Sequence, residues 1–125
     1  MSNKLVIIKL SIGNYNSISK CLKKLNINHI VSDKNEDIIS ANKLILPGIG
    51  SFGPFMEEIY EKKIDQIIHK KFLNKKPILG ICVGFQSFFQ NSEESPNIKG
   101  LNLLSGKFKK LELHKNIKKN AIKKN

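Results

Sequence analysis

The chain has 125 residues, 40% of them hydrophobic, and a formal net charge of +12. This length suits one compact domain. No apolar run approaches the roughly 20 residues that span a bilayer, and Lys9 interrupts the apolar start too early for a signal peptide. The two cysteines, Cys21 and Cys82, show no metal-ligand or redox spacing, so we expect a reduced, cytoplasmic protein with no metal and no cofactor.

The positive charge comes entirely from lysine. None of the 22 basic residues is arginine, the residue best suited to bidentate recognition of bases and phosphates. More than half of the excess charge lies in residues 107–125. We therefore expect no specific nucleic-acid binding. Residues 109–125 are rich in Lys and Asn without a core pattern, which predicts a disordered tail behind a domain of residues 1–108.

Short apolar strands alternate with helical patterns along the chain. The first strand, 5–10, precedes a helix over 14–26 whose apolar face carries Ile18, Cys21, Leu22 and Leu25. The further predicted elements are a strand at 28–32, a helix at 33–41, a strand at 43–46 stopped by Pro47 and Gly48, a helical region over 55–74 broken near Lys63, a strand from Pro77, and a possible strand over 106–113.

Alternating strands and helices favour parallel pairing through right-handed crossovers. The sequence therefore predicts a doubly wound α/β fold, a mostly parallel sheet with flanking helices. In such sheets the chemistry gathers at the carboxyl ends of the strands. Three loops are expected there: 11–14, 47–53 and the turn around Cys82.

The turn around Cys82 has the pattern Gly80-Ile-Cys82-Val-Gly84 at the end of an apolar strand. Glycines two residues either side of a nucleophile permit a sharp strand-to-helix turn that exposes its side chain. The positive end of the following helix would favour the reactive thiolate. The alternative is a small buried cysteine at a strand end.

The loop Gly48-Ile49-Gly50-Ser51-Phe52-Gly53 follows the third strand. It matches a dinucleotide-binding pattern, but it lies outside the first strand-helix unit and no acidic residue stands about 20 residues further on. Glycines also let backbone N–H groups approach an oxyanion closely. We therefore expect this loop to face Cys82.

Two segments together resemble a known family. Residues 44–53 followed by 77–86 are similar to class I glutamine amidotransferases, and among these to the glutaminase subunits of imidazole glycerol phosphate synthase in histidine biosynthesis. Gly13-Asn14, Ser92-Glu93-Glu94 and the segment 100–107 extend the resemblance over about residues 4–110.

This resemblance implies roles for particular residues. Cys82 would attack the side-chain amide of glutamine, forming a glutamyl thioester and releasing ammonia. The backbone N–H of Val83 and one from the Ile49–Gly50 peptide would form the oxyanion hole. Gly48, Gly50 and Gln86 would line the glutamine site. The ammonia would pass to a (β/α)₈-barrel cyclase subunit in a heterodimer.

The resemblance also implies a histidine and, two residues later, a glutamate in a C-terminal segment. His114 is the only histidine after Cys82, and Asn116 stands at the second position beyond it; His29 and His69 precede Cys82. Lys9-Leu10-Ser11 replaces the family's usual Asp-Tyr-Gly after the first strand. We therefore expect a C-terminally truncated chain that is inactive alone.

Three other functions are compatible with the sequence. The chain could be a noncatalytic remnant that binds a barrel partner. It could be a cysteine-elbow protein of the wider superfamily. It could also be the amidotransferase subunit of a related pathway that amidates surface sugars.

Overall fold

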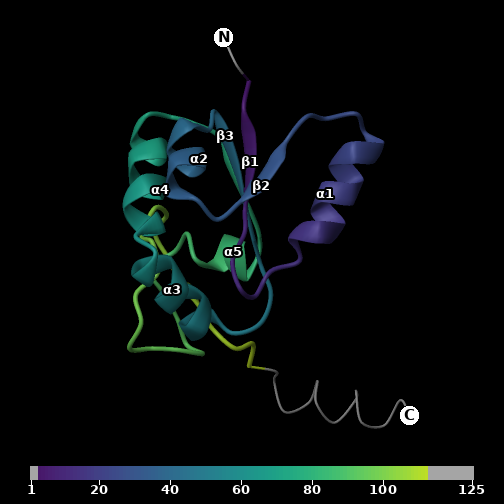
Figure 1. Cartoon of the computed structure of the whole chain (residues 1–125). Helices are drawn as coiled ribbons and strands as arrows, with labels where there is room; N and C mark the ends of the chain where they lie inside the picture. Colours follow the sequence, from purple (N-terminus) through teal and green to yellow (C-terminus); the bar gives the residue numbers. More distant parts are fainter. Residues whose placement is uncertain (1–2, 113–125) are drawn as a thin grey trace, which may run out of the picture.

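The computed structural model describes residues 3–112 and contains a central parallel sheet flanked by helices (Figure 1). In chain order its elements are β1 (Leu5–Ile8), α1 (Tyr15–Lys24), β2 (Ile30–Ser32), α2 (Asn35–Ser40), β3 (Lys43–Gly48), α3 (Phe52–Glu61), α4 (Ile64–Leu73), β4 (Ile78–Cys82), α5 (Val83–Gln86), β5 (Asn91–Ser92) and β6 (Lys107–Phe108). The main sheet has the order β2–β1–β3–β4 with every pair parallel.

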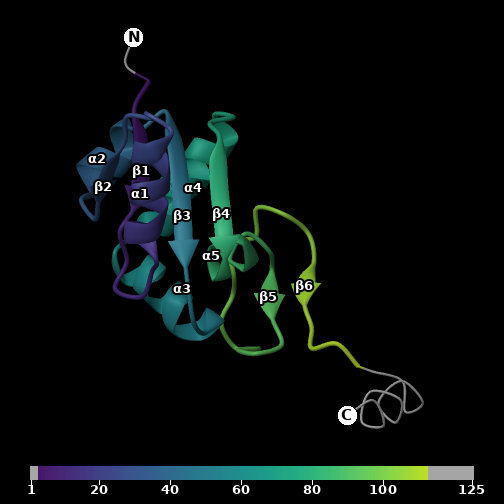
Figure 2. The same cartoon turned by 90° about the vertical axis from the view of Figure 1, so that its right-hand side faces the viewer.

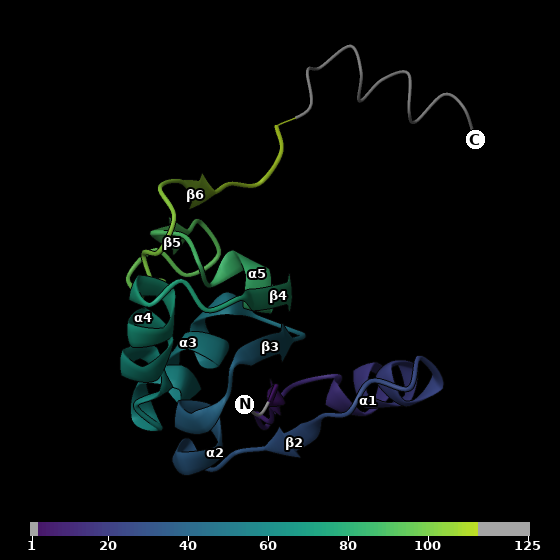
Figure 3. The same cartoon turned by 90° about the horizontal axis from the view of Figure 1, so that it is seen from above.

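Helices lie on both faces of this sheet. Figure 3 shows α1 on one side of the strands and α2, α3 and α4 on the other. The predicted doubly wound α/β fold is confirmed. None of the helices within residues 3–112 is long and apolar enough to cross a membrane.

The hydrophobic core fills the space between the sheet and helices α2, α3 and α4. Alternate residues of β1 and β3 point into it because side chains alternate between the two faces of a strand. Each fully buried aliphatic or aromatic side chain contributes about 1.5–3 kcal/mol. The main contributors are Val6, Ile8, Leu44 and Leu46 from the strands and Ile38, Phe55, Met56, Ile59, Ile64 and Ile68 from the helices.

The opposite face of the sheet is covered only in part. Helix α1 turns Ser19 inward, where its hydroxyl lies 2.7 Å from the Nε2 atom of His29. The predicted apolar face of this helix is therefore only partly covered: Cys21 and Leu25 are exposed, and its other two members are half-buried. On β4 the outward-facing Leu79 is 55% exposed, because α1 lies over β1 and β2.

The third strand continues through Pro47 and Gly48, contrary to the prediction that they stop it. Both residues pair with β4, in register with Ile81 and Cys82. Pairing with β1 ends at Ile45, so the missing N–H of Pro47 leaves no bond unmade. The strand therefore reaches two residues further, to the level of Cys82.

The helical region after β3 is broken where the sequence predicts it. Lys63 has φ 57°, a left-handed conformation, and separates α3 from α4. The predicted strand over 106–113 is present only as β6, which pairs with β5 outside the main sheet (Figure 2). Of the predicted tail, residues 113–125 lie outside the described part of the chain.

Candidate functional site

The site begins at the turn where β4 ends. Cys82 has φ 56° and ψ −121° and is exposed, and α5 starts at the next residue. A residue other than glycine in such a region stores about 1–3 kcal/mol of strain, and such strain gathers at functional positions. The exposure of Cys82 excludes the alternative of a buried cysteine at a strand end.

The glycines flanking Cys82 are required by the close packing of the turn. A Cβ on Gly80 would lie 2.7 Å from the Cα atom of Phe85 and 2.6 Å from the ring of Phe88. A Cβ on Gly84 would lie 2.0 Å from the carbonyl oxygen of Leu46. The second glycine thus lets α5 press directly against β3.

The glycine loop after β3 lies beside this turn. Gly48 is in register with Cys82 across the β3–β4 pair. A Cβ on Gly48 would lie 2.5 Å from the side chains of both Phe55 and Val83. Gly50 has φ 89°, which favours glycine, and both Ile49 and Gly50 are exposed. The fold therefore brings the loop and the exposed thiol together.

Helix α5 is a single turn of four residues. The prediction that a helix dipole activates Cys82 is therefore weakened, because the dipole sums over aligned peptides. The turn is held instead by aromatic packing: the ring of Phe85 meets those of Phe89 and Phe108 edge-to-face, at centroid distances of 5.3 and 5.9 Å.

Gln86 lies one helical turn beyond Cys82 and is half-buried. It lines a groove of about 510 Å³ together with Ser92, Glu93, Glu94 and Lys109. The groove thus offers an amide and charges of both signs close to the turn. The two glutamates were not predicted as site residues, although the Ser-Glu-Glu run was visible in the sequence.

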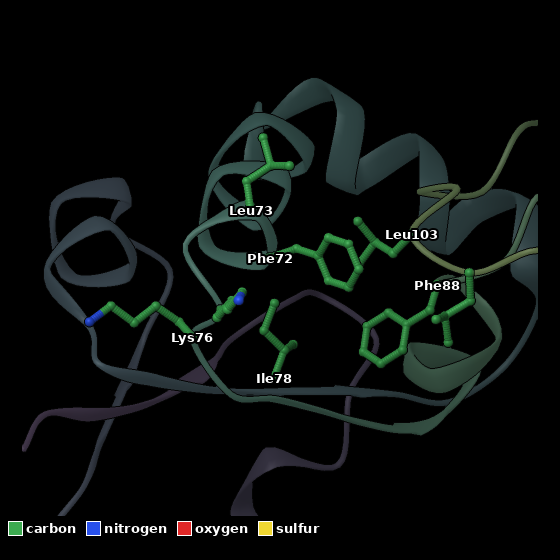
Figure 4. A pocket seen from close by; sticks show the side chains of 8 residues that line it. Phe72, Leu73, Lys76, Ile78, Phe88 and Leu103 are labelled. Carbon is green, nitrogen blue, oxygen red and sulfur yellow. The ribbon is translucent and has the colours of Figure 1, made fainter.

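A second, more apolar groove lies elsewhere. It has a volume of about 560 Å³ and is lined by Phe72, Ile78, Phe88 and Leu103 among others (Figure 4). Ile78 opens β4 whereas Cys82 closes it, so this groove lies toward the amino end of the strand. It is not part of the site around the thiol.

Neither described histidine is placed to act on Cys82. The ring of His29 lies between the Ser19 hydroxyl and the carbonyl of Ile27, just before β2 at the opposite edge of the sheet. His69 on α4 bonds the carbonyl of Leu101 at 2.5 Å. His114 lies outside the described residues. Residues 3–112 also hold no group of three or more His, Cys, Asp or Glu that could bind a metal ion.

Comparison with known proteins places this geometry in a family. Residues 6–124 match the family described as Glutamine amidotransferase class-I. The chain is 41% identical over 106 residues to the imidazole glycerol phosphate synthase subunit HisH of Bacillus velezensis, covering 85% of this chain and 50% of that protein. It is 43% identical over 101 residues to HisH of Halalkalibacterium halodurans, covering 81% and 47%.

A solved structure supports the fold. A crystal structure of a glutamine amidotransferase superimposes with a TM-score of 0.71 at 21% identity, over 83% of this chain and 55% of the other. The chain spans about half the length of the curated relatives it matches.

Proposed function

The chain belongs to the class I glutamine amidotransferase family, and from that premise we propose that Cys82 is the nucleophile of a glutaminase. The observation that carries the proposal is the exposed, strained Cys82 at a strand-to-helix turn, in register with Gly48. A merely structural cysteine gains nothing from this conformation. A nucleophilic thiolate gains from it, because the turn exposes the sulfur to a substrate at the carboxyl edge of the sheet.

The proposed reaction is acyl transfer from glutamine to sulfur. The Cys82 thiolate adds to the side-chain carbonyl, and collapse of the tetrahedral intermediate breaks the C–N bond. Ammonia leaves after its nitrogen takes up a proton, and water later hydrolyses the thioester. The N–H groups of Val83 and Gly50 would stabilise the oxyanion, a contribution of about 3 kcal/mol for each donor.

The groove at Gln86 is the proposed binding site for glutamine. Its amide can bond the substrate, and Gly48 and Gly50 are the further residues proposed to bind glutamine. Free glutamine carries an ammonium and a carboxylate, and the groove presents Glu93 and Glu94 as well as Lys109. This pairing of charges suits an amino acid better than a neutral substrate.

A general base is the missing part of this proposal. Within the described residues both histidines are engaged away from Cys82. A base must reach its proton at hydrogen-bond distance. We therefore propose negligible glutaminase activity for this chain alone, which a second chain that supplies a base would rescue.

The proposed partner is a (β/α)₈-barrel cyclase that receives the ammonia. The names of the HisH relatives support histidine biosynthesis over the amidation of surface sugars. The same reasoning makes a cytoplasmic heterodimer the expected assembly.

The test is acylation of the thiol. γ-Glutamyl p-nitrophenyl ester needs no base to expel its leaving group, and the reaction is run near pH 9 because the thiolate is the attacking species. We expect a glutamyl adduct on Cys82 by peptide mass spectrometry, lost in Cys82→Ala and kept in the matched control Cys21→Ala. Absence of the adduct would refute the proposal that Cys82 is the nucleophile. Rapid ammonia release from glutamine by the chain alone would refute the proposal that the chain lacks a general base.

A further inference from the structure

One carboxylate outside the proposed site holds a loop that borders it. Glu58 on α3 accepts hydrogen bonds from the backbone N–H of Ser11 at 2.8 Å and 3.1 Å, one to each oxygen. Lys62, the residue that follows the end of α3, donates to the same carboxylate at 2.7 Å. The Glu58 side chain is only 14% exposed. This contact ties residue 11 to a helix far along the chain.

The charge on Glu58 is maintained where it lies. Partial burial raises the pKa of its carboxyl, but the hydrogen bonds from Lys62 and Ser11 outweigh burial and leave the pKa below its ordinary value. The group is therefore an anion at neutral pH. A charged acceptor forms a stronger hydrogen bond to an N–H than a neutral one does.

The loop held by Glu58 packs along the glycine loop. The Cγ2 atom of Ile12 lies 3.6 Å from the position that a Cβ on Gly50 would occupy. A Cβ on Gly13 would lie 3.7 Å from the carbonyl oxygen of Pro47. Residues 11–14 therefore form one wall against residues 47–50, and Ile12 sits over the glycine whose φ is 89°.

We propose that Glu58 is a positioning residue for the oxyanion loop, acting through the Ser11 N–H and the placement of Ile12 beside Gly50. Gly50 has many accessible conformations, and only some aim its N–H toward Cys82. A wall fixed to α3 restricts those conformations. The inference rests on the proposed function, because it concerns how the oxyanion donor is held.

Two electrophiles distinguish an effect on the oxyanion loop from a general loss of stability. Acylation of Cys82 by γ-glutamyl p-nitrophenyl ester passes through a tetrahedral oxyanion, whereas alkylation by iodoacetamide does not. In the first reaction the C–S bond forms, the ester C–O bond breaks and p-nitrophenolate leaves. Both rates are measured on the full chain carrying Cys21→Ala, so that Cys82 is the remaining cysteine and both reagents report on its thiol.

Glu58→Ala should slow acylation about tenfold, because small displacements of an oxyanion donor are costly. Iodoacetamide should react within about twofold of the parent rate, since its transition state uses no such donor. Glu58→Gln should restore much of the loss because its amide oxygen still accepts from Ser11. Glu57→Ala, on the exposed side of the same helix, is the matched control and should change neither rate.

Ile12→Ala tests the route and guards against misfolding of the Glu58 variants. Its side chain is 42% exposed, so its loss should be tolerated while acylation falls as in Glu58→Ala. An unchanged acylation rate in Glu58→Ala or Ile12→Ala would overturn the positioning inference but leave the proposed function standing. An equal fall in the rates of acylation and alkylation would do the same. Failure of the parent chain to be acylated would refute the proposed function and this inference with it.

Discussion

Replacing Gly84 by alanine should strongly destabilise the turn that carries Cys82. The added Cβ would meet the Leu46 carbonyl oxygen at 2.0 Å, where ordinary contact begins at 3.4 Å. The Cβ position is set by the backbone and the oxygen is a backbone atom, so no side-chain rotation relieves the overlap. Helix α5 would have to move from β3 by an ångström or more, opening the packing of the buried Val83. We expect a loss of about 3 kcal/mol in the free energy of unfolding, at the upper end for overpacking.

The assay is urea denaturation followed by far-UV circular dichroism. With a slope of about 1.5 kcal/mol/M, the loss lowers the midpoint by about 2 M. Gly13→Ala is the matched control, because its Cβ would find only ordinary contacts from 3.7 Å outward. A loss below about 0.5 kcal/mol in Gly84→Ala, the range of surface substitutions, would refute the close approach of α5 to β3.

Four further substitutions test other features of the structure. Cys82→Gly should raise the free energy of unfolding by about 1 kcal/mol, because glycine accepts φ 56° without strain. Cys21→Gly within α1 should instead lower it by about 0.3 kcal/mol, and thermal melts compare the two variants. The hydrogen bond from Ser32, followed by the one from Lys4, holds the pKa of Asp37 below its ordinary 3.8. The ionised carboxylate therefore stabilises the fold fully at pH values above its unfolded-state pKa, and this stabilisation is lost as the pH falls through its folded-state pKa. Asp37→Asn should therefore flatten the fall of Tm in acid, and a parallel profile would contradict the pairing. Tyr60→Phe removes a hydroxyl that donates to the carbonyls of residues 99 and 100, and should cost about 1 kcal/mol in urea denaturation; no loss would show that water replaces these bonds.

The architecture could be predicted from the sequence because the patterns that indicate it are local. Apolar strands alternating with helical patterns predict a parallel sheet, and the glycine spacing around Cys82 predicts the exposed turn. The break at Lys63 was also predicted. Each of these depends on residues close together in the chain.

What the sequence did not predict depends on partners far along the chain. Pro47 extends β3 because β1 has already stopped pairing there, which no local pattern reveals. Ser19 rather than Cys21 faces inward because His29 meets it from the segment before β2. The contact of Glu58 with Ser11 joins positions 47 residues apart. An acidic residue on a helix ordinarily predicts only a solvated surface.

The left-handed residue between α3 and α4 sets the length of the connection between the two halves of the site. A continuous helix over residues 52–73 would extend about 33 Å at 1.5 Å per residue. The five residues of β4 span about 17 Å. Unbroken, the crossover would overshoot the amino end of the sheet and delay the start of β4. The left-handed turn at Lys63 divides this length between two shorter helices, and the chain then enters β4 so that Cys82 ends level with Gly48.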